Sequence, residues 1–399
     1  MDATLLRHAR SYARNYHEEE VRLLSKLAAI PSPTHHEGRR EAFVADWLRR
    51  QGAKDVRIDE QGNVLCLLRG RHPRKDGKPR DVAVFSAHTD IVFPDTDPLP
   101  VRIEHGRMMA PGVGDDTANL VALMAATRHL LHDDGAYDRA TRDVDILVVA
   151  DTCEEGLGNL AGTRALFEGL RDKGRHVRSF CSFDLYLSQC ISHAVGSERF
   201  RIRVKTQGGH SYQNFGRPNA VEVLCQVIEA LYAIELPVDP DTGAKTTINV
   251  GHMEGGGTVN SIASQAGALF EFRSESAANL KRMEGLFRAA LDSCRRDGVD
   301  IEVETIGVRP GNGPVDARRL AALAKRSADT IRSVTGRDVD ASPASTDANI
   351  PLSLGIPSIC VGAVRGSLLH TRDEWVDLAS LEDGLALVLS LMLQASDAL

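Results

Sequence analysis

The chain has 399 residues, more than one hydrophobic core normally supports, so two domains are expected. Its apolar fraction of 42% is ordinary for a folded protein, which excludes a disordered chain. The formal net charge of -7 is spread along the sequence without a basic block, which argues against nucleic acid as the main partner.

The cysteine content and the apolar stretches indicate the cellular compartment in which the protein is expected. Seven cysteines are scattered without a Cys-x-x-Cys pair, which indicates free thiols in a reducing environment. The first residues lack the apolar core of a secretory signal. The longest apolar stretch, 385–393, is too short to span a bilayer. We therefore expect a cytoplasmic protein without a membrane segment.

The first part of the chain shows helix and strand signals in turn. Four segments have the patterns of two amphipathic helices and a strand pair: 3–30, 37–51, 56–59 and 63–68. The first helix is expected to stop at Ile30-Pro31, because proline cannot continue it. The basic segment 69–80 is rich in Pro and Gly and is interpreted as a solvated loop.

Two apolar runs, 82–87 and 144–150, have the character of buried strands in a parallel sheet. Histidine or carboxylate residues come soon after each run: His88, Asp90, Glu154 and Glu155. Open α/β sheets bind their ligands at the carboxyl ends of the strands. These four side chains are therefore expected to share one pocket.

Asp115 and Asp116 precede a segment, 117–132, with helical periodicity, so they lie near a helix N-terminus that favours anions. Adjacent carboxylates repel one another unless a cation compensates. His88, Asp115 and Glu155 are nitrogen and oxygen ligands that suit zinc, manganese or cobalt. The lack of a cysteine cage favours a catalytic metal site over a structural one.

Further along, segment 160–173 is predicted to be a helix and 177–183 a strand. This strand would carry Asp184 to the same edge of the sheet. Asp184 is therefore a candidate additional metal ligand.

The pattern changes near residue 196. The predicted order of strand, helix, strand, strand, helix and strand is that of a ferredoxin-like domain, over segments 199–205, 218–234, 246–253, 267–273, 277–296 and 300–306. The α/β pattern then resumes with segments 315–334, 356–361 and 381–395, and His370 lies in the loop before the last of them.

We therefore expect an α/β catalytic domain formed by residues 1–195 and 308–399, with a smaller α+β domain, 196–307, inserted into it. The alternating segment 199–205 is a candidate edge strand for pairing with another chain. Charged edge strands also serve to prevent such pairing, so both readings stay open.

The motifs occur in an order that resembles one known family. The matching motifs are His88-Thr-Asp90, Gly114-Asp-Asp116, Glu154-Glu-Gly156, Asp184, Gly208-Gly-His-Ser211, Val259-Asn-Ser-Ile262, Phe272-Arg-Ser274, Ser345-Thr-Asp-Ala-Asn349 and Leu369-His370. They resemble those of the co-catalytic dizinc metallopeptidases, which include aminoacylase, carboxypeptidase G, peptidase T, and the acetylornithine and succinyl-diaminopimelate deacylases. The resemblance covers nearly the whole chain and is greatest for members similar to peptidase T.

The resemblance implies an aminopeptidase-like mixed sheet with helices on both faces, a lid domain that mediates homodimer formation, and two divalent metal ions. Zinc is the expected metal, with cobalt or manganese as alternatives. In the family's pattern Asp115 would bridge the ions, His88 and Asp184 would complete one site, and Glu155 and His370 the other. The family also tends to have a cis peptide bond after the bridging residue, here between Asp115 and Asp116.

The resemblance also assigns roles beyond the metal ligands. Asp90 would hydrogen-bond His88 and fix its tautomer, and Glu154 would act as the general base. His210 in the lid would stabilise the oxyanion, often in the active site of the partner subunit. Candidate substrate contacts are Asn260, Arg273, Thr346 and Asn349. For Arg273 the alternative is an ion pair on its own strand.

The reaction class implied is hydrolysis of an amide bond in a small peptide or N-acyl amino acid. An aminopeptidase acting on di- or tripeptides is favoured, and a deacylase of N-acyl amino acids is the alternative. A binding protein on an inactive peptidase fold is an alternative of another class. Loss of Asp115 or Glu154 would mark such a protein, and both are present.

Overall fold

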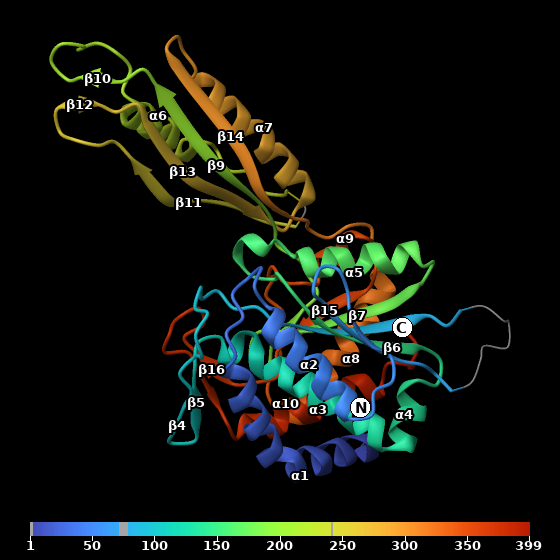
Figure 1. Cartoon of the computed structure of the whole chain (residues 1–399). Helices are drawn as coiled ribbons and strands as arrows, with labels where there is room; N and C mark the ends of the chain where they lie inside the picture. Colours follow the sequence, from blue (N-terminus) through green and yellow to red (C-terminus); the bar gives the residue numbers. More distant parts are fainter. Residues whose placement is uncertain (1–2, 72–78, 241) are drawn as a thin grey trace. The chain divides into compact units, whose positions relative to one another are not determined.

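The computed structural model describes residues 3–71, 79–240 and 242–399, and the chain forms two compact units (Figure 1). Unit 1 comprises Met1–His193 and Pro314–Leu399, and unit 2 comprises Ala194–Gly313. The sequence suggested divisions after residues 195 and 307, whereas the units divide after residues 193 and 313. Part of the predicted loop 69–80 lies outside the described residues.

Unit 1 is built on a mixed seven-stranded sheet, as expected. Its strand order is β1-β2-β6-β3-β7-β15-β8, with bounds Val56–Ile58, Val64–Leu68, Asp145–Asp151, Val82–His88, Val177–Phe183, Ser358–Val361 and Cys190–Ile191. The four strands β6, β3, β7 and β15 are mutually parallel, and antiparallel strands flank them on both sides. The central strand β3 is buried along its whole length because both faces of the sheet are covered.

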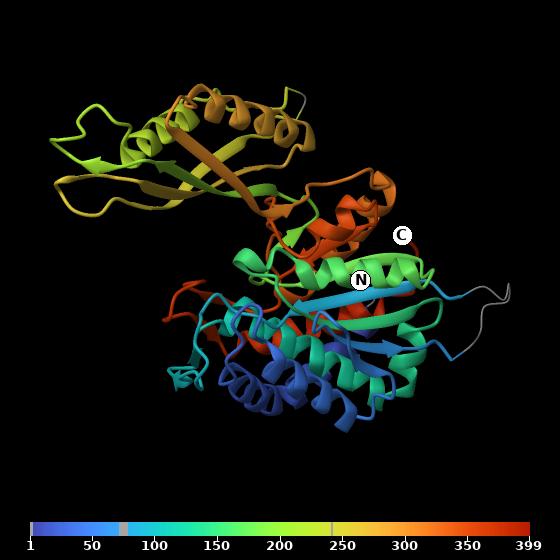
Figure 2. The same cartoon turned by 45° about the horizontal axis from the view of Figure 1, so that its top comes forward.

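Helices cover both faces of this sheet (Figures 1 and 2). On one face α1 (Ala3–Ala28), α3 (Ala118–His132) and α10 (Ser380–Leu393) pack together. On the other face lies α5 (Ala161–Asp172). The remaining long helices of the unit are α2 (Gly38–Arg50) and α8 (Ala317–Thr335). None of the helices in the described ranges combines the length and apolar character needed to cross a membrane.

Several short elements were not predicted. They include α4 (Asp134–Ala140), α9 (Asn349–Ser353) and a small sheet of order β16-β17-β5-β4, over Gly366–Ser367, Trp375–Asp377, Arg107–Met109 and Arg102–Glu104. Each strand of this sheet has two or three residues, too few for a periodic pattern in the sequence. Its strand β17 begins directly after Glu374, and this residue proves important for the site.

Unit 2 has the predicted ferredoxin-like pattern. Its sheet has the order β11-β13-β9-β14, over Thr246–Gly255, Gln265–Ser274, Gly196–Thr206 and Val299–Arg309, and α6 (Ala220–Tyr232) and α7 (Ala277–Ser293) pack against it. The core between them contains four phenylalanines: Phe200, Phe270, Phe272 and Phe287.

The edge-strand reading of segment 199–205 was wrong. This segment belongs to β9, which pairs with β13 on one side and β14 on the other. Its charged side chains instead form ion pairs across the sheet, such as Arg201 with Glu304 and Lys205 with Glu302. The edge positions belong to β11 and β14. The residues of β11 from His252 to Gly255 are exposed, and within the described residues β11 pairs with β13 alone.

Candidate metal centre

Three parallel strands of the unit 1 sheet bring the predicted site residues together at their carboxyl ends. Strand β3 ends at His88 and lies between β6, which precedes Glu154 and Glu155, and β7, which precedes Asp184. All four side chains are buried. The arrangement follows from the sheet, because parallel neighbours end on the same side.

Asp115 lies between two histidines from distant parts of the chain. Its Oδ1 is 3.0 Å from His88 Nε2, and its Oδ2 is 3.1 Å from His370 Nε2. His370 Nε2 is also 3.2 Å from Glu155 Oε1. Each oxygen of Asp115 therefore faces a different imidazole, and one of these imidazoles also faces Glu155.

A second group of possible ligands overlaps the first. The ligand atoms of His88, Asp116 and Asp184 lie within 4.8 Å of one another, as do those of His88, Asp115 and Glu155. Asp116 Oδ2 accepts a hydrogen bond of 2.8 Å from the backbone N–H of His88. Its Oδ1 is buried without a hydrogen-bond partner among the described residues. Asp116 as a possible ligand was not predicted from the sequence.

The backbone around these residues is unusual in ways that set side-chain directions. The peptide bond between Asp115 and Asp116 is cis, which confirms that prediction. Cys153, Leu185 and His370 have positive φ angles of 58°, 72° and 60°. Such angles are uncommon for residues other than glycine and cluster at functional sites. They occur here directly before Glu154, directly after Asp184, and at His370 itself.

Asp90 supports the site differently from the prediction. His88 Nδ1 lies 3.0 Å from the backbone carbonyl oxygen of Asp90 and 3.5 Å from its carboxylate. The carboxylate instead accepts hydrogen bonds from the backbone N–H groups of Glu154 and Glu155, each of 3.0 Å, and from the Thr34 hydroxyl. One residue thus orients both the histidine and the pair of glutamates.

Glu374 is a supporting residue that the sequence analysis missed. It is fully buried, and its carboxylate accepts hydrogen bonds of 2.8 to 2.9 Å from the backbone N–H groups of Gly112, Gly114 and Asp115. A Cβ atom at Gly114 would meet Glu374 Oε1 at 2.8 Å, so a larger residue there would displace this carboxylate. No local sequence pattern reveals such a contact, because its partners lie far apart in the chain.

Arg40 is a second supporting residue that was missed. Its guanidinium is fully buried and donates to the backbone carbonyl oxygens of Ile30 and Thr89 and to the Thr117 hydroxyl. Burial lowers the pKa of Arg40 to about 10, against the effect of nearby Asp90 and Asp116. A buried cation of this kind requires compensating carboxylates, and two of the site's acids face it.

The pKa shifts of the buried carboxyl groups indicate that the site binds a cation. Burial, together with the charge of Asp115, raises the pKa of Glu155 to about 7 and that of Asp184 well above its usual range. Burial would also raise the pKa of Asp115, but hydrogen bonds to His370 and His88 hold it below its usual range. These shifts mean that ionising all three acids together is unfavourable without added positive charge.

The donor set fits divalent metal ions. It consists of imidazole nitrogens and carboxylate oxygens, which suit zinc, cobalt and manganese, and contains no thiolate. A divalent ion would supply the charge that the carboxylates lack, and the imidazoles would bind it in their neutral form. The buried Oε1 of Glu155, a proposed ligand, has no hydrogen-bond partner among the described residues, which further indicates that protein groups alone do not satisfy this site.

The predicted residues of unit 2 lie at two separate ends of its sheet. His210 in β10 (Gly209–His210) is exposed and pairs with Ser261 in β12 (Ser261–Ile262), beside Asn260. Arg273 pairs with Ser197 near the other end of β9. The strand between these ends implies a separation of roughly 30 Å. Within one copy of unit 2, the three residues therefore do not form a single cluster.

Arg273 has a partner in its own sheet. Its guanidinium donates to both carboxylate oxygens of Glu271, at 2.8 and 3.1 Å. Arg199 also pairs with Glu271. This is the ion pair that the sequence analysis gave as the alternative role for Arg273.

Thr346 and Asn349 are buried, and short-range hydrogen bonds hold both in one turn. The backbone N–H of Thr346 donates to Asn349 Oδ1, and the Thr346 hydroxyl oxygen accepts from the N–H of Ala348. These contacts shape the turn at which α9 begins. Direct contact of either residue with a substrate stays a prediction.

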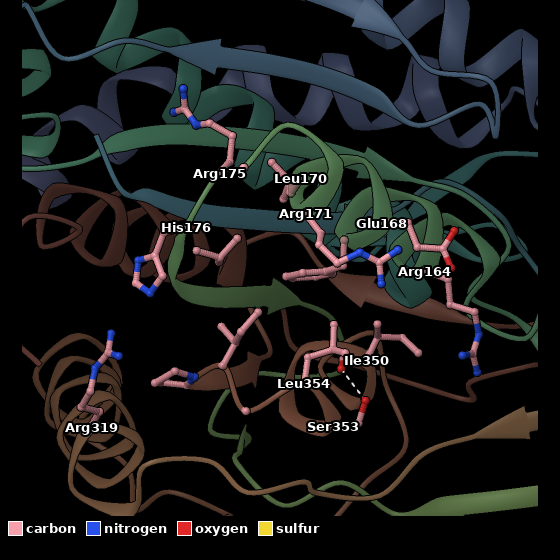
Figure 3. Close-up of a pocket in the computed structure, with 16 residues that line it drawn as sticks. Arg164, Glu168, Leu170, Arg171, Arg175, His176, Arg319, Ile350, Ser353 and Leu354 are labelled. Carbon is pink, nitrogen blue, oxygen red and sulfur yellow. Dashed lines mark hydrogen bonds between the residues drawn. The ribbon is translucent and has the colours of Figure 1, made fainter. Parts of the chain in front are cut away.

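A separate cavity of about 610 Å³ lies at the opposite end of β7 (Figure 3). Its lining includes Val177, the first residue of β7, whereas Asp184 follows the last. Seven residues of extended strand separate these ends by about 20 Å. None of the predicted site residues lines this cavity, so it is not the candidate metal centre.

The comparisons with known proteins agree with the geometry. A model of peptidase family M20/M25/M40 matches residues 84–394. The chain is 25% identical over 405 residues to YqjE, an uncharacterized protein of Bacillus subtilis, covering 94% of this chain and 99% of that protein. It is 25% identical over 378 residues to succinyl-diaminopimelate desuccinylase of Bordetella parapertussis, covering 90% and 93%. The crystal structure of aminopeptidase PepT from Bacillus cereus superposes with a TM-score of 0.70 at 21% identity, covering 96% and 99%.

Proposed function

The chain belongs to peptidase family M20/M25/M40, and we propose that it uses two divalent metal ions to hydrolyse an amide bond in a small peptide. The observation that carries this proposal is the position of Asp115, whose two carboxylate oxygens face His88 and His370. A carboxylate with an imidazole beside each oxygen is suited to bridge two metal ions.

The proposed ligands divide into two sets that share Asp115. His88 and Asp184 would complete one site, and Glu155 and His370 the other. Asp116 stays as support for His88, because one of its oxygens already accepts the backbone N–H of that residue. When bound, two such ions, zinc being the expected metal, would polarise the scissile carbonyl and lower the pKa of a water molecule toward neutrality.

Glu154 is the proposed general base. Its side chain is buried at the edge of the sheet where the proposed ligands meet, and its backbone N–H is held by Asp90. In this position it would accept the proton of the attacking water and deliver it to the leaving nitrogen. Its neighbour Glu155 faces His370 and Asp115 and so takes the ligand role.

The proposed substrate is a di- or tripeptide with a free amino end. The motif resemblance to peptidase T supports it, and the fold similarity to PepT is compatible with it. A deacylase of N-acyl amino acids is the second candidate. The sequence similarity to a succinyl-diaminopimelate desuccinylase over most of both chains favours that alternative.

We further propose a homodimer in which His210 of one copy serves the metal centre of the other. His210 and Asn260 lie roughly 30 Å from the end of unit 2 where the chain enters and leaves it, at Gly196 and Arg309. Within the described residues β11 pairs with no strand on its outer side, so this exposed edge offers a surface for strand pairing between copies.

The substrate proposal is tested by mass spectrometry of products from a mixture of a free-amine tripeptide and its N-acetylated counterpart, with zinc-loaded protein. We expect release of the N-terminal residue from the free peptide alone. Loss of acetyl from the blocked peptide would establish the deacylase instead. Cleavage of neither would favour an inactive binding protein or a different amide substrate, and would overturn the peptidase proposal.

A further inference from the structure

A second cluster of metal-ligating side chains lies at the far end of α3 from the candidate metal centre. It contains His8 of α1, His129 in the last turn of α3, and Asp133 directly after that helix. One ligand atom from each lies within 4.8 Å of the other two. Helix α3 begins next to Asp116 and spans 15 residues, so about 20 Å of helix separates the two clusters.

The distances within the cluster are close to those of a metal site. His8 Nε2 lies 2.7 Å from His129 Nε2, and Asp133 Oδ2 lies 3.8 Å and 3.9 Å from these two nitrogens. Ligand atoms about 2.1 Å from a tetrahedral zinc ion are separated by about 3.4 Å. Changes of roughly 0.4 to 0.7 Å in these separations would therefore bring all three atoms into place.

The two oxygens of the Asp133 carboxylate have different partners, and one of them faces the two histidines. Asp133 Oδ1 accepts a hydrogen bond of 2.9 Å from the backbone N–H of Ala136 and so caps α4. The other oxygen, Oδ2, faces both Nε2 atoms. The capping contact fixes the carboxylate plane before any ion arrives, which reduces the entropy cost of binding.

The two imidazoles differ in burial in a way that suits metal binding. His129 is 8% exposed, and the Tyr12 ring packs at 4.2 Å between centroids. This packing holds the ring with its Nε2 toward His8 Nε2 and Asp133 Oδ2. The side chains of His8 and Asp133 are 42% and 37% exposed, which leaves a route for an ion and room for water as a further ligand.

We propose that His8, His129 and Asp133 bind a third divalent transition-metal ion that fastens α1 to the C-terminal end of α3. Two imidazoles and one carboxylate suit zinc, cobalt, nickel or copper and disfavour magnesium or calcium. Since His8 is in the second turn of α1 and the other ligands lie in and after α3, the ion adds a link between two helices that already pack together and share the hydrogen bond from the Tyr12 hydroxyl to the Ala125 carbonyl oxygen. The site is independent of the proposed catalytic function.

Zinc binding by full-length variants tests the proposal. His8→Gln and Asp133→Asn each remove one ligand, and asparagine retains the ability to cap α4. The matched control is His132→Gln, which changes another histidine at the end of α3 that is not part of the cluster. Inductively coupled plasma mass spectrometry after dialysis against micromolar zinc should find one zinc ion more per chain in the wild type and the control than in the two ligand variants.

Thermal unfolding gives a second readout that does not depend on activity. Added zinc should raise the Tm of the wild type and of His132→Gln by about 2–5 °C more than that of His8→Gln. Equal zinc content and equal zinc response in the wild type and His8→Gln would overturn the proposal and leave a hydrogen-bonded histidine pair. Because none of these residues belongs to the proposed catalytic site, hydrolytic activity in saturating zinc should be the same in all four proteins.

Discussion

Asp115 Oδ2 lies 3.1 Å from His370 Nε2, although the two residues belong to distant parts of the chain. Asp115 follows the turn after β5, whereas His370 lies in the loop between β16 and β17. The contact joins the two segments of unit 1 on either side of unit 2. The candidate metal centre therefore forms only when both segments have folded together.

Asp115→Asn should remove both metal ions and reduce activity by about three orders of magnitude or more. Asparagine has one carbonyl oxygen, so it cannot place an anionic oxygen beside each of His88 and His370. Metal content by plasma mass spectrometry and turnover of a tripeptide measure the two effects. The control is Asp95→Asn, which changes a surface partner of Arg372 and should leave both unchanged. Full metal content in Asp115→Asn would contradict the bridging role.

Glu374→Gln should destabilise the protein and weaken metal binding. The carboxylate accepts three backbone N–H groups, and an amide presents its NH₂ group to at least one of them. An unsatisfied buried donor costs about 1–3 kcal/mol, which thermal unfolding of the metal-free protein would detect. Asp373→Asn is the matched control, because the neighbouring side chain is 81% exposed. Equal stability of the two variants would mean that Glu374 does not organise the turn at Asp115.

Glu20→Met should stabilise the protein, and the gain should increase with pH. Glu20 is fully buried in α1, and neither carboxyl oxygen has a hydrogen-bond partner among the described residues. Burial and the nearby Glu382 raise its pKa well above the usual range. The folded state therefore holds a proton that the unfolded state releases above about pH 4.3, so wild-type stability falls as pH rises through the folded-state pKa.

The size of this effect can be bounded and measured. Removing a buried, unpaired carboxyl group is worth roughly 1–3 kcal/mol at pH 8 and less at pH 5. Urea unfolding of both proteins at the two pH values gives the difference directly. Glu19→Gln changes an exposed residue paired with Arg22 and should leave stability nearly unchanged at both pH values. A gain in Glu20→Met that is the same at both pH values would show that Glu20 stays ionised in the folded protein.

His210→Ala should lower kcat by about 10² to 10³ if His210 stabilises the oxyanion. If His210 acts in the site of a partner copy, subunits with different defects should complement each other. Mixing His210→Ala with Glu154→Gln under conditions of subunit exchange should restore about a quarter of wild-type activity, because half of the dimers are mixed and each has one intact site. Failure to restore activity in a confirmed mixed dimer would place His210 in the site of its own chain, or outside the site.

Much of unit 1 could be predicted because its central strands are long apolar runs. Segments 82–87 and 144–150 became β3 and β6 with nearly the expected ends, and they carry His88 and the glutamate pair to one edge. The free cysteines were also confirmed, since all seven are unpaired. The cis bond after Asp115 followed from the family resemblance and not from any local pattern.

The sequence did not reveal the residues that support the site. Glu374 and Arg40 act through backbone groups in distant segments, so neither leaves a recognisable spacing in the sequence. The position of β9 inside its sheet was missed because alternation shows that a strand has one buried face, and not whether it has neighbours on both sides. The distance between His210 and Arg273 likewise depends on strand register, which periodicity does not give.

The adjacent pair Glu154 and Glu155 offers the most direct test of the account, because the two residues are given different tasks. In Glu154→Gln we expect turnover of a tripeptide to be abolished while the metal content stays at two ions in the proposed centre. In Glu155→Gln we expect the metal content itself to fall, with activity lost as a consequence. Parallel measurement of kcat and of bound metal in the two variants would show this division of roles. Retained turnover in Glu154→Gln, or loss of metal from it as complete as in Glu155→Gln, would contradict the assignment of Glu154 as the general base.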